Sequence, residues 1–492
     1  MKRSSGILMP VFSLPSPYGI GTIGKSAYDF VDFLHAAGQS WWQFLPLGPA
    51  ACGNSPYSAV SSFAGNPYYI DLDMLIQEGI LCSEDLKGRV ESQNSDCVDY
   101  KKLFDSRIEI LRIAFGKGRE KLRDEIRKFR DENTPWVANY ALYMALKARF
   151  DMTSWTEWPE DIKKRSPEAV ERYTSELAEE IAFWVFTQFL FYRQWNALRA
   201  YAAEKGIGFI GDIPVYVPLD SADVWSEPQF FDLDEDYVPR EVSGVPPDVF
   251  CEEGQLWGNP LYNYEAMRRD GYGWWIRRVE GASKLYDAVR IDHFRGFESY
   301  WAVPYGEKTA INGVWRKGPG LELVHILTSW FNSLSFIAED LGILTDDVRK
   351  LLSDSGLPGM KVLEFAFDAS GTSSYLPHNI GFNSVCYVGT HDNDTVLGWL
   401  DTASEADREF AAKYMHVKED DSWPWAFIRT GMSTSANLFV AQMQDVLELP
   451  GSARTNIPGV AEGNWRWRML PGAADAGVAE KLLDMTQTFR RI

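Results

Sequence analysis

Short runs of apolar residues recur along the chain and alternate with amphipathic stretches of helical length. Apolar runs of strand length occupy residues 40–46, 208–213, 288–291, 335–338, 361–367 and 384–389. Runs of this length that are bounded by turn residues are typical of buried strands. Because helical patterns such as the one over residues 345–355 separate the later runs, the alternation predicts a parallel sheet covered by helices.

Two long stretches interrupt this alternation. The chain has 492 residues, whereas a bare parallel α/β barrel needs about 250. No Ser/Gly-rich linker divides the chain. We therefore predict an α/β fold: one (β/α)8 TIM barrel over residues 1–492 with large inserted subdomains. The insertions cover about residues 60–205, mainly helical, and about residues 218–272, loop-rich and carrying a lid, and the eighth strand falls between Ser433 and Asn456.

Three acidic residues follow strand-like runs near the middle and end of the chain. Asp292, Glu339 and Asp392 are separated by 47 and 53 residues, which is room for one strand, one helix and their loops. In a parallel barrel such positions meet at the carboxyl-end rim, where catalytic groups lie. Two carboxyl groups at that rim are the minimum machinery for cleaving a glycosidic bond. Ordinary ion pairs at strand ends are the alternative interpretation for any one of these acids.

Composition narrows the class of partner. The net charge is −20 and no sustained Lys/Arg stripe is present, so nucleic acid is not expected as a partner, because phosphate binding needs cations. The first six residues carry no apolar signal region and no run has transmembrane length, which predicts no membrane association. The five cysteines are scattered without CxxC spacing, which suits reduced thiols in a cytoplasmic protein.

Two motifs are set aside. Gly19 to Gly24 match GxGxxG, but Pro15 and Pro17 disrupt the strand that a dinucleotide-binding fold requires before it. Asp392-Asn393-Asp394 resembles the start of a calcium loop, yet the later ligands and the turn glycine are missing. The histidines have no metal-binding spacing either. We therefore expect neither a metal nor a cofactor.

A family resemblance rests on motifs that occur in order from about residue 6 to residue 468. The motifs are GNSPY at 53–57, GNPY at 65–68, GDIPVY at 211–216, GQLWGNP at 254–260, RIDHFRG at 290–296, AEDLG at 338–342, GTHDNDT at 389–395 and NWRWR at 464–468. Together they resemble the amylomaltases, also called 4-α-glucanotransferases or disproportionating enzymes, which form glycoside hydrolase family 77 of the α-amylase superfamily.

The resemblance implies a role for each matching residue. Asp292 matches the nucleophile, Glu339 the acid/base, and Asp392 the acid that holds sugar hydroxyls and distorts the ring. Further positions that match residues close to the bound sugar are Arg290, His391, Asp212, Ser55, Tyr57, Asp248, Gln255 and Trp257, with Asn379 added from its own context. The implied activity is transfer of α-1,4-glucan segments from a donor to the 4-hydroxyl of an acceptor glucan or of glucose.

Physical reasons support three of these roles independently of the resemblance. A retaining mechanism needs two carboxyl groups about 5 Å apart, one ionised and one protonated. Arg290 lies two residues before Asp292 on a strand, so both side chains face the same side, and the guanidinium favours the ionised carboxylate. Glu339 follows an apolar run, and partial desolvation helps a carboxyl group to keep its proton.

Two alternatives remain open from sequence. A plain α-glucan hydrolase would use the same acids on the same barrel, and only the lid and the whole-chain resemblance disfavour it. A non-catalytic glucan-binding protein would lack at least one acid, whereas all three are present. The chain also departs from the family pattern at Ala50, Ala51 and Cys52, where an aromatic residue is usual. This departure leaves a secondary glucan site in question.

Overall fold

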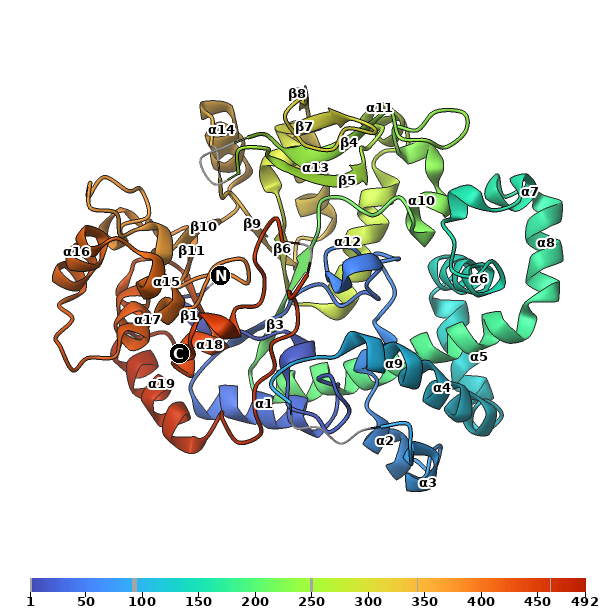
Figure 1. The fold of residues 1–492 in the computed structure, drawn as a ribbon, viewed down its shortest axis with the longest axis horizontal. Coiled ribbons are helices and arrows are strands. Elements are labelled where there is room, and N and C mark those ends of the chain that lie inside the picture. The colour runs from blue at the N-terminus through green and yellow to red at the C-terminus, as the bar shows by residue number, and fades with distance from the viewer. Residues whose placement is uncertain (1, 91–94, 248–250, 343, 461) are drawn as a thin grey trace.

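The computed structural model describes residues 2–90, 95–247, 251–342, 344–460 and 462–492. Within them, parallel strands close into an eight-stranded barrel in which each strand neighbours the next along the chain and the last pairs with the first. The barrel strands are β1 (Ser4–Leu8), β2 (Trp41–Gln43), β3 (Gly208–Ile213), β6 (Ala288–Ile291), β9 (Ser335–Ala338), β10 (Gly359–Val362), β11 (Ser384–Tyr387) and β12 (Leu438–Gln442). The predicted TIM barrel is confirmed (Figure 1).

Three predicted strands match β3, β6 and β9 in their bounds, whereas the runs predicted at 40–46 and 384–389 are longer than β2 and β11. The strand predicted over residues 361–367 is wrong beyond Val362, where a 3-10 turn, Leu363–Phe365, takes over. Leu363 is buried like the strand before it, and an unbroken apolar run cannot show where a strand bends into a turn. The first strand, β1, was not among those expected, and β12 lies inside the interval given for the eighth.

Helices follow most of the strands and form the outer layer. They are α1 (Lys25–Ala36), α9 (Ala178–Glu204), α12 (Gly273–Leu285), α13 (Gly320–Trp330), α14 (Asp346–Ser355), α17 (Trp423–Ser433) and α19 (Ala476–Thr488). Between β10 and β11 the chain forms two 3-10 turns, one at residues 363–365 and one at Pro377–Asn379. That connection keeps a loop, rather than an α-helix, beside the carboxyl ends of the strands.

A helical insertion lies on one side of the barrel, on the right of Figure 1. Its helices are α2 (Leu72–Gln77), α3 (Ser83–Leu86), α4 (Tyr100–Gly118), α5 (Arg123–Glu132), α6 (Trp136–Arg149), α7 (Glu160–Lys163) and α8 (Pro167–Glu176). The barrel helix α9 joins this insertion to the barrel. Its Phe186 packs against Phe115 of α4, and its Trp195 packs against Phe44 after β2. A helix covered on several sides needs apolar residues around its circumference.

A four-stranded antiparallel sheet forms a second addition, at the top of Figure 1. Its strands are β4 (Glu241–Val245), β5 (Gln255–Pro260), β7 (Ser299–Pro304) and β8 (Val314–Lys317). Residues 218–272 were expected to be loop-like, yet they hold two of these strands, and the sheet draws its other two from beyond residue 272. The remaining helices are α10 (Ala222–Ser226), α11 (Tyr264–Arg269), α15 (Val396–Thr402), α16 (Glu405–Met415) and α18 (Met443–Val446).

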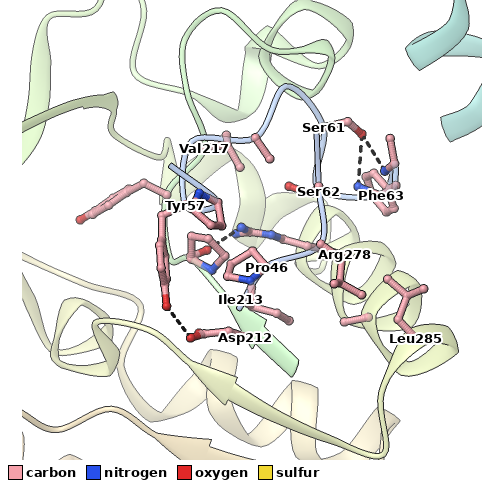
Figure 2. A pocket seen from close by; sticks show the side chains of 18 of the residues that line it. Pro46, Tyr57, Ser61, Ser62, Phe63, Asp212, Ile213, Val217, Arg278 and Leu285 are labelled. Atoms are coloured by element: carbon pink, nitrogen blue, oxygen red, sulfur yellow. Dashed lines mark hydrogen bonds between the residues drawn. The ribbon is translucent and has the colours of Figure 1, made fainter. Parts of the chain in front are cut away.

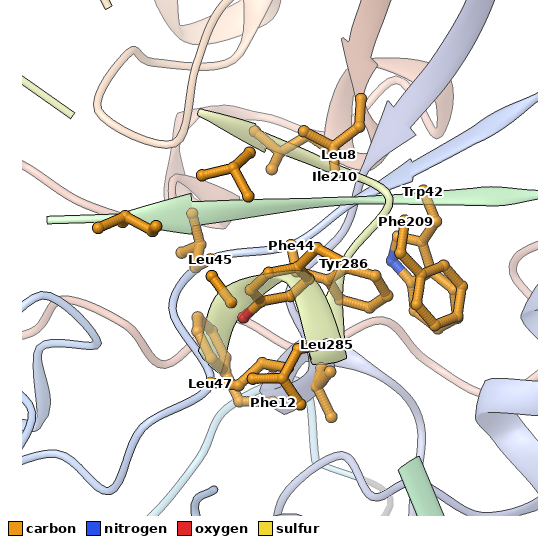
Figure 3. Packing of buried hydrophobic residues seen from close by; sticks show 14 of the residues in the cluster. Leu8, Phe12, Trp42, Phe44, Leu45, Leu47, Phe209, Ile210, Leu285 and Tyr286 are labelled. Atoms are coloured by element: carbon orange, nitrogen blue, oxygen red, sulfur yellow. The ribbon is translucent and has the colours of Figure 1, made fainter. Parts of the chain in front are cut away.

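Aromatic side chains fill the space between the first barrel strands and the surrounding helices (Figure 3). The rings of Trp42 and Phe44 are 4.4 Å apart, and Phe44 lies 4.9 Å from Phe209 on β3. Trp195 also donates its indole N–H to the carbonyl oxygen of Leu285, at 3.1 Å. Tightly packed rings of this kind fix the strand ends with little freedom, and the strand ends carry the site.

Candidate active site

Adjacent strand ends bring the predicted acids to one rim of the barrel. Asp212 lies in β3 beside Arg290 of β6, and Ile291 at the end of β6 pairs with Ala338 at the end of β9. Asp292 and Glu339 are the next residues along these two strands. Asp392 follows β11 by five residues. The structure thus brings together acids that the spacing in sequence had placed at one rim, and their roles stay predictions.

Arg290 lies at the centre of the charged cluster and contacts two of its acids. One of its terminal nitrogens lies 2.9 and 2.7 Å from the two carboxylate oxygens of Asp212 and 3.0 Å from Oδ1 of Asp292. The side chain of Arg290 is only 4% exposed. Burial lowers the pKa of Arg290, but Asp212 and Asp292 outweigh burial and raise that pKa well above its ordinary value. The buried guanidinium therefore holds the carboxylates of Asp212 and Asp292 side by side at the rim.

Glu339 is partly buried and is held by two backbone amides. The N–H groups of His293 and Leu341 each donate to one of its carboxyl oxygens, both at 2.7 Å. Burial raises the pKa of Glu339 to about 7, and the negative charge of Asp292 adds to this rise against the opposing effect of Arg290. A carboxyl group that titrates near neutral pH is suited to general acid and general base work.

His293 takes a rare backbone conformation to make one of these bonds. It lies immediately after Asp292 and has a positive φ of 49°. A non-glycine residue in the left-handed region costs free energy and clusters at functional sites. The turn aims the His293 N–H at Glu339, so one local distortion couples the segment that carries Asp292 to the carboxyl group of Glu339.

Asp392 is the most exposed of the three acids, with 43% of its side chain accessible. The side-chain amide of Asn456 donates to its Oδ1 at 2.6 Å, and the guanidinium of Arg454 donates to its carbonyl oxygen. His391 lies 3.3 Å from the same Oδ1 through its Nε2. Asn456 and Arg454 were not predicted from sequence, because they come from the segment after β12 and no local pattern links them to Asp392.

Tyr57 and His391 form one wall beside the acids. The hydroxyl of Tyr57 donates to Oδ2 of Asp212 at 2.7 Å (Figure 2). The Tyr57 ring also stacks on the imidazole of His391, with ring centroids 5.0 Å apart. Burial lowers the pKa of His391, so the imidazole is neutral at neutral pH. Ser55 accepts a hydrogen bond from the Tyr57 backbone N–H at 3.3 Å, which shapes the loop that presents Tyr57. A cavity of about 50 Å³ borders Tyr57 and Asp212.

Trp257 on β5 is the point where the antiparallel sheet meets the acids. Its ring stands edge-to-face with His293 at 4.8 Å, and its indole N–H donates to the Gln255 side chain at 3.2 Å. The side chain remains 37% exposed. An exposed indole beside the catalytic rim is a suitable platform for a sugar ring.

The described residues give no support for the sugar contacts predicted for Asp248 and Asn379. Asp248 lies outside the described residues. Asn379 is exposed in its 3-10 turn, and its amide donates to the Ser373 carbonyl oxygen at 3.1 Å. Among the described residues, no hydrogen bond joins Asn379 to the three acids. Its predicted contact with sugar remains a prediction.

The described parts of the chain show two further features that bear on function. They contain no group of three or more His, Cys, Asp or Glu side chains arranged to hold a metal ion. In the same parts, no helix combines the length and the apolar character needed to cross a bilayer.

The fold and this rim of carboxyl groups define a class of protein, the barrel enzymes that act on glycosidic bonds. A family model described as glycoside hydrolase family 77, 4-alpha-glucanotransferase, matches residues 9–473. The chain therefore belongs to the 4-alpha-glucanotransferase family.

Individual relatives are similar in sequence to this chain over nearly the whole of both chains. The 4-alpha-glucanotransferase of Clostridium butyricum is 44% identical, with 98% of this chain and all of the relative covered. That of Thermus thermophilus is 45% identical over the full length of both chains. The solved amylomaltase of Streptococcus agalactiae in complex with acarbose is 38% identical, covers both chains fully and superposes with a TM-score of 0.97.

Proposed function

We propose that this 4-α-glucanotransferase works by retaining double displacement, with Asp292 as nucleophile, Glu339 as acid/base and Asp392 as the acid that holds the distorted sugar. As a member of its family, the chain transfers α-1,4-glucan segments from a donor to an acceptor glucan or glucose. One observation carries the assignment. Arg290 contacts the Asp292 carboxylate at 3.0 Å, whereas two backbone amides hold Glu339, whose pKa is raised to about 7, and these different surroundings suit a nucleophile and an acid/base.

The first step breaks the donor bond. Glu339 gives its proton to the bridging oxygen, and the Asp292 carboxylate attacks the anomeric carbon to form a covalent β-linked glucosyl-enzyme. In the second step the ionised Glu339 removes the proton from the 4-hydroxyl of the acceptor, which displaces Asp292 and restores an α-1,4 bond. Glu339 ends protonated and Asp292 ends ionised, so the enzyme is regenerated.

The surrounding residues supply sugar contacts in this proposal. Tyr57, His391 and Asp212 border the ring next to Asp292, where Tyr57 and Asp212 are already hydrogen-bonded to each other. Gln255 and Trp257 present the lid from β5. Ser55, Asp248 and Asn379 complete the proposed set. Acarbose bound to the Streptococcus agalactiae relative supports a sugar site in this fold.

Transfer competes with hydrolysis at the glucosyl-enzyme, because water can replace the acceptor. Transfer prevails when acceptor sites hold a sugar in position and exclude water. The contact of Trp257 with His293, whose N–H holds Glu339, supports a role of the lid in this choice. A hydrolase on the same barrel remains the nearest alternative, and a binding protein without catalysis is the more distant one.

Two broader features are proposed with the reaction. The chain forms one barrel with a helical insertion at about residues 60–205 and a lid-bearing insertion at about residues 218–272. We also place the protein in the cytoplasm. The thiols of Cys82, Cys97 and Cys386 are free, and free thiols are typical of a reducing compartment.

Incubation with maltotriose tests the reaction. Free glucose, longer oligosaccharides and total reducing ends are followed together. Disproportionation gives glucose and a ladder of longer chains while the number of reducing ends stays constant. Rising reducing ends without longer products would identify a hydrolase, and no change in any of the three would contradict catalysis on maltotriose.

A further inference from the structure

Two buried carboxyl groups that the proposed reaction does not use lie behind the loop that carries Asp392. Glu364 is 8% exposed and belongs to the turn after β10, and Asp445 is fully buried in α18 after β12. Because β11 lies between β10 and β12 in the barrel, these acids flank the strand end from which the loop at residues 388–395 departs. The two groups therefore face the loop from both sides.

Glu364 packs against the first residues of this loop. Its backbone N–H donates to the Val388 carbonyl oxygen at 3.2 Å. A β-carbon placed on Gly389 would lie 2.4 Å from Glu364 Oε1 and 2.7 Å from Gln442 Nε2. Such close contact is possible only because residue 389 has no side chain. The loop start is thus pressed against the carboxyl group of Glu364.

The far end of the same loop is held from β12 and α18. Gln442 donates its side-chain amide to the Asp394 carbonyl oxygen at 3.0 Å, and Asp445 Oδ1 accepts the Val396 N–H at 2.7 Å. Both ends of the loop are therefore clamped, and Asp392 lies between the clamps.

The surroundings of Glu364 do not support a negative charge. The charged groups that face it are Asp445, Asp394 and Arg454. The Arg454 guanidinium already donates to the Asp392 and Asn456 carbonyl oxygens and lies 3.7 Å from Asp394 Oδ2. Among the described residues, Oε1 of Glu364 and Oδ2 of Asp445 have no hydrogen-bond partner. An ionised carboxylate buried without a cation of its own is strongly destabilised.

The direction of the Glu364 pKa shift agrees with the lack of a cation at its carboxyl group. Burial, followed by the charges of Asp445 and Asp394, raises the pKa of Glu364 well above its ordinary value, against the smaller effects of Arg454 and Asn393. Burial also raises the pKa of Asp445 to about 7. At neutral pH the carboxyl group of Glu364 therefore keeps its proton.

We propose that Glu364 is a positioning residue that acts as a neutral carboxylic acid, fixing the loop from Gly389 to Asp394 so that Asp392 meets the sugar in the correct place. The inference rests on the role proposed above for Asp392. Loss of the proton would place a further negative charge beside Asp394 and Asp445 and push the loop out of position. A small displacement of a group that orients substrate can cost about a hundredfold in rate.

Two substitutions separate shape and charge at this position. Glu364→Gln keeps the size and the neutral charge, so kcat on maltotriose should stay within about threefold of the unmodified enzyme. Glu364→Ala removes the support, and kcat should fall by about 10- to 100-fold, with KM changed less than kcat. The proposal is overturned if the Gln variant is as slow as the Ala variant, or if the Ala variant keeps full kcat.

The pH dependence of the melting temperature tests whether Glu364 is protonated, without an activity measurement. The pKa of Glu364 is raised in the folded protein, so its stability contribution is complete at low pH and declines as the pH rises toward the folded pKa. Between about pH 5.5 and pH 8.5, the melting temperature of the unmodified enzyme should therefore fall more than that of Glu364→Gln. Equal falls would overturn the neutral state of Glu364.

Controls keep this inference distinct from the catalytic assignment. Glu419→Gln changes an exposed glutamate and should leave both readouts unchanged. Asp392→Asn should be inactive at every pH while melting normally. If Asp392→Asn keeps its transfer activity, the assigned role of Asp392 fails. If it is inactive and the two Glu364 variants do not differ, the positioning role of Glu364 fails.

Discussion

At the scale of single residues, the site depends on one buried cation, Arg290, which contacts two of the neighbouring acids and not the third. Arg290 contacts Asp212 and Asp292 directly, whereas Glu339 is held by backbone amides instead. The side chains of Asp292 and Glu339 are both partly buried, but Asp292 is paired with the cation, whereas the pKa of Glu339 is raised to about 7. The two carboxyl groups therefore have different partners, as an acid and a nucleophile at one site require.

The pH profile should report the proton on Glu339. Its pKa is raised to about 7, and the acid form is needed to expel a sugar leaving group, so kcat/KM for maltotriose should be high below neutral pH and fall above it. With α-glucosyl fluoride as donor, expulsion of fluoride needs little protonation, and the alkaline fall should move to higher pH. The same alkaline fall with both donors would contradict the acid role.

The nucleophile assignment predicts a covalent intermediate on Asp292. Asp292→Asn should lower kcat by more than about a thousandfold. In Glu339→Gln, glucosyl fluoride should load the enzyme without efficient turnover, because the base for the second step is missing. Mass spectrometry of the digested protein should then find one glucosyl unit on the peptide that contains Asp292. A label on another acid, or a label formed in the Asp292→Asn variant, would refute the assignment.

At the scale of elements, the antiparallel sheet brings β5 over the rim formed by β6 and β9. Trp257 reaches from β5 to His293, and His293 reaches to Glu339. A lid element therefore contacts the residue that orients the proposed acid/base. Because loops and strands added to a barrel carry specificity while the barrel carries geometry, we assign the choice between transfer and hydrolysis to this sheet.

Removal of the Trp257 side chain should change that choice. Trp257→Ala should raise the ratio of hydrolysis to transfer on maltotriose by about 3- to 30-fold, because an exposed indole both binds sugar and displaces water. The ratio follows from reducing ends and glucose measured in the same reaction. Trp330→Ala, an exposed tryptophan at the end of α13, is the matched control. A ratio that is equal in the two variants would remove the lid from the mechanism.

At the scale of the whole molecule, the barrel and the helical insertion share one apolar core. Phe44 after β2 contacts Trp42, Trp195 and Phe209, which belong to two strands and to α9. The helix α9 carries this packing outward to Phe115 of α4. We therefore expect the barrel and the insertion to unfold together rather than in separate steps.

Truncation of a side chain in this shared core should lower the free energy of unfolding. Phe44→Ala should lower the free energy of unfolding by about 3–5 kcal/mol, since it removes a buried ring and leaves a cavity. Phe382→Ala, at a side chain that is 67% exposed, should change it by less than about 0.5 kcal/mol. Denaturant unfolding followed by tryptophan fluorescence and by circular dichroism measures both. Two separate transitions would contradict the shared core.

The sequence by itself determined the barrel and its acids. Buried parallel strands must be short apolar runs, and three of the predicted strands, β3, β6 and β9, match the structure residue for residue. Asp292 and Glu339 follow such runs directly and Asp392 follows β11 by five residues, so their common rim followed from topology alone. Local sequence also carried Arg290, because side chains two apart on a strand share a face.

Only the tertiary structure decided how these residues support one another. The contacts of Asp392 with Asn456 and Arg454, and of Gly389 with Glu364, join segments from separate strands. The antiparallel sheet likewise combines strands from both sides of β6. No local pattern encodes these pairings, because they depend on which strand ends become neighbours once the barrel closes. Burial, which sets the pKa of Glu339, is likewise a property of the closed molecule.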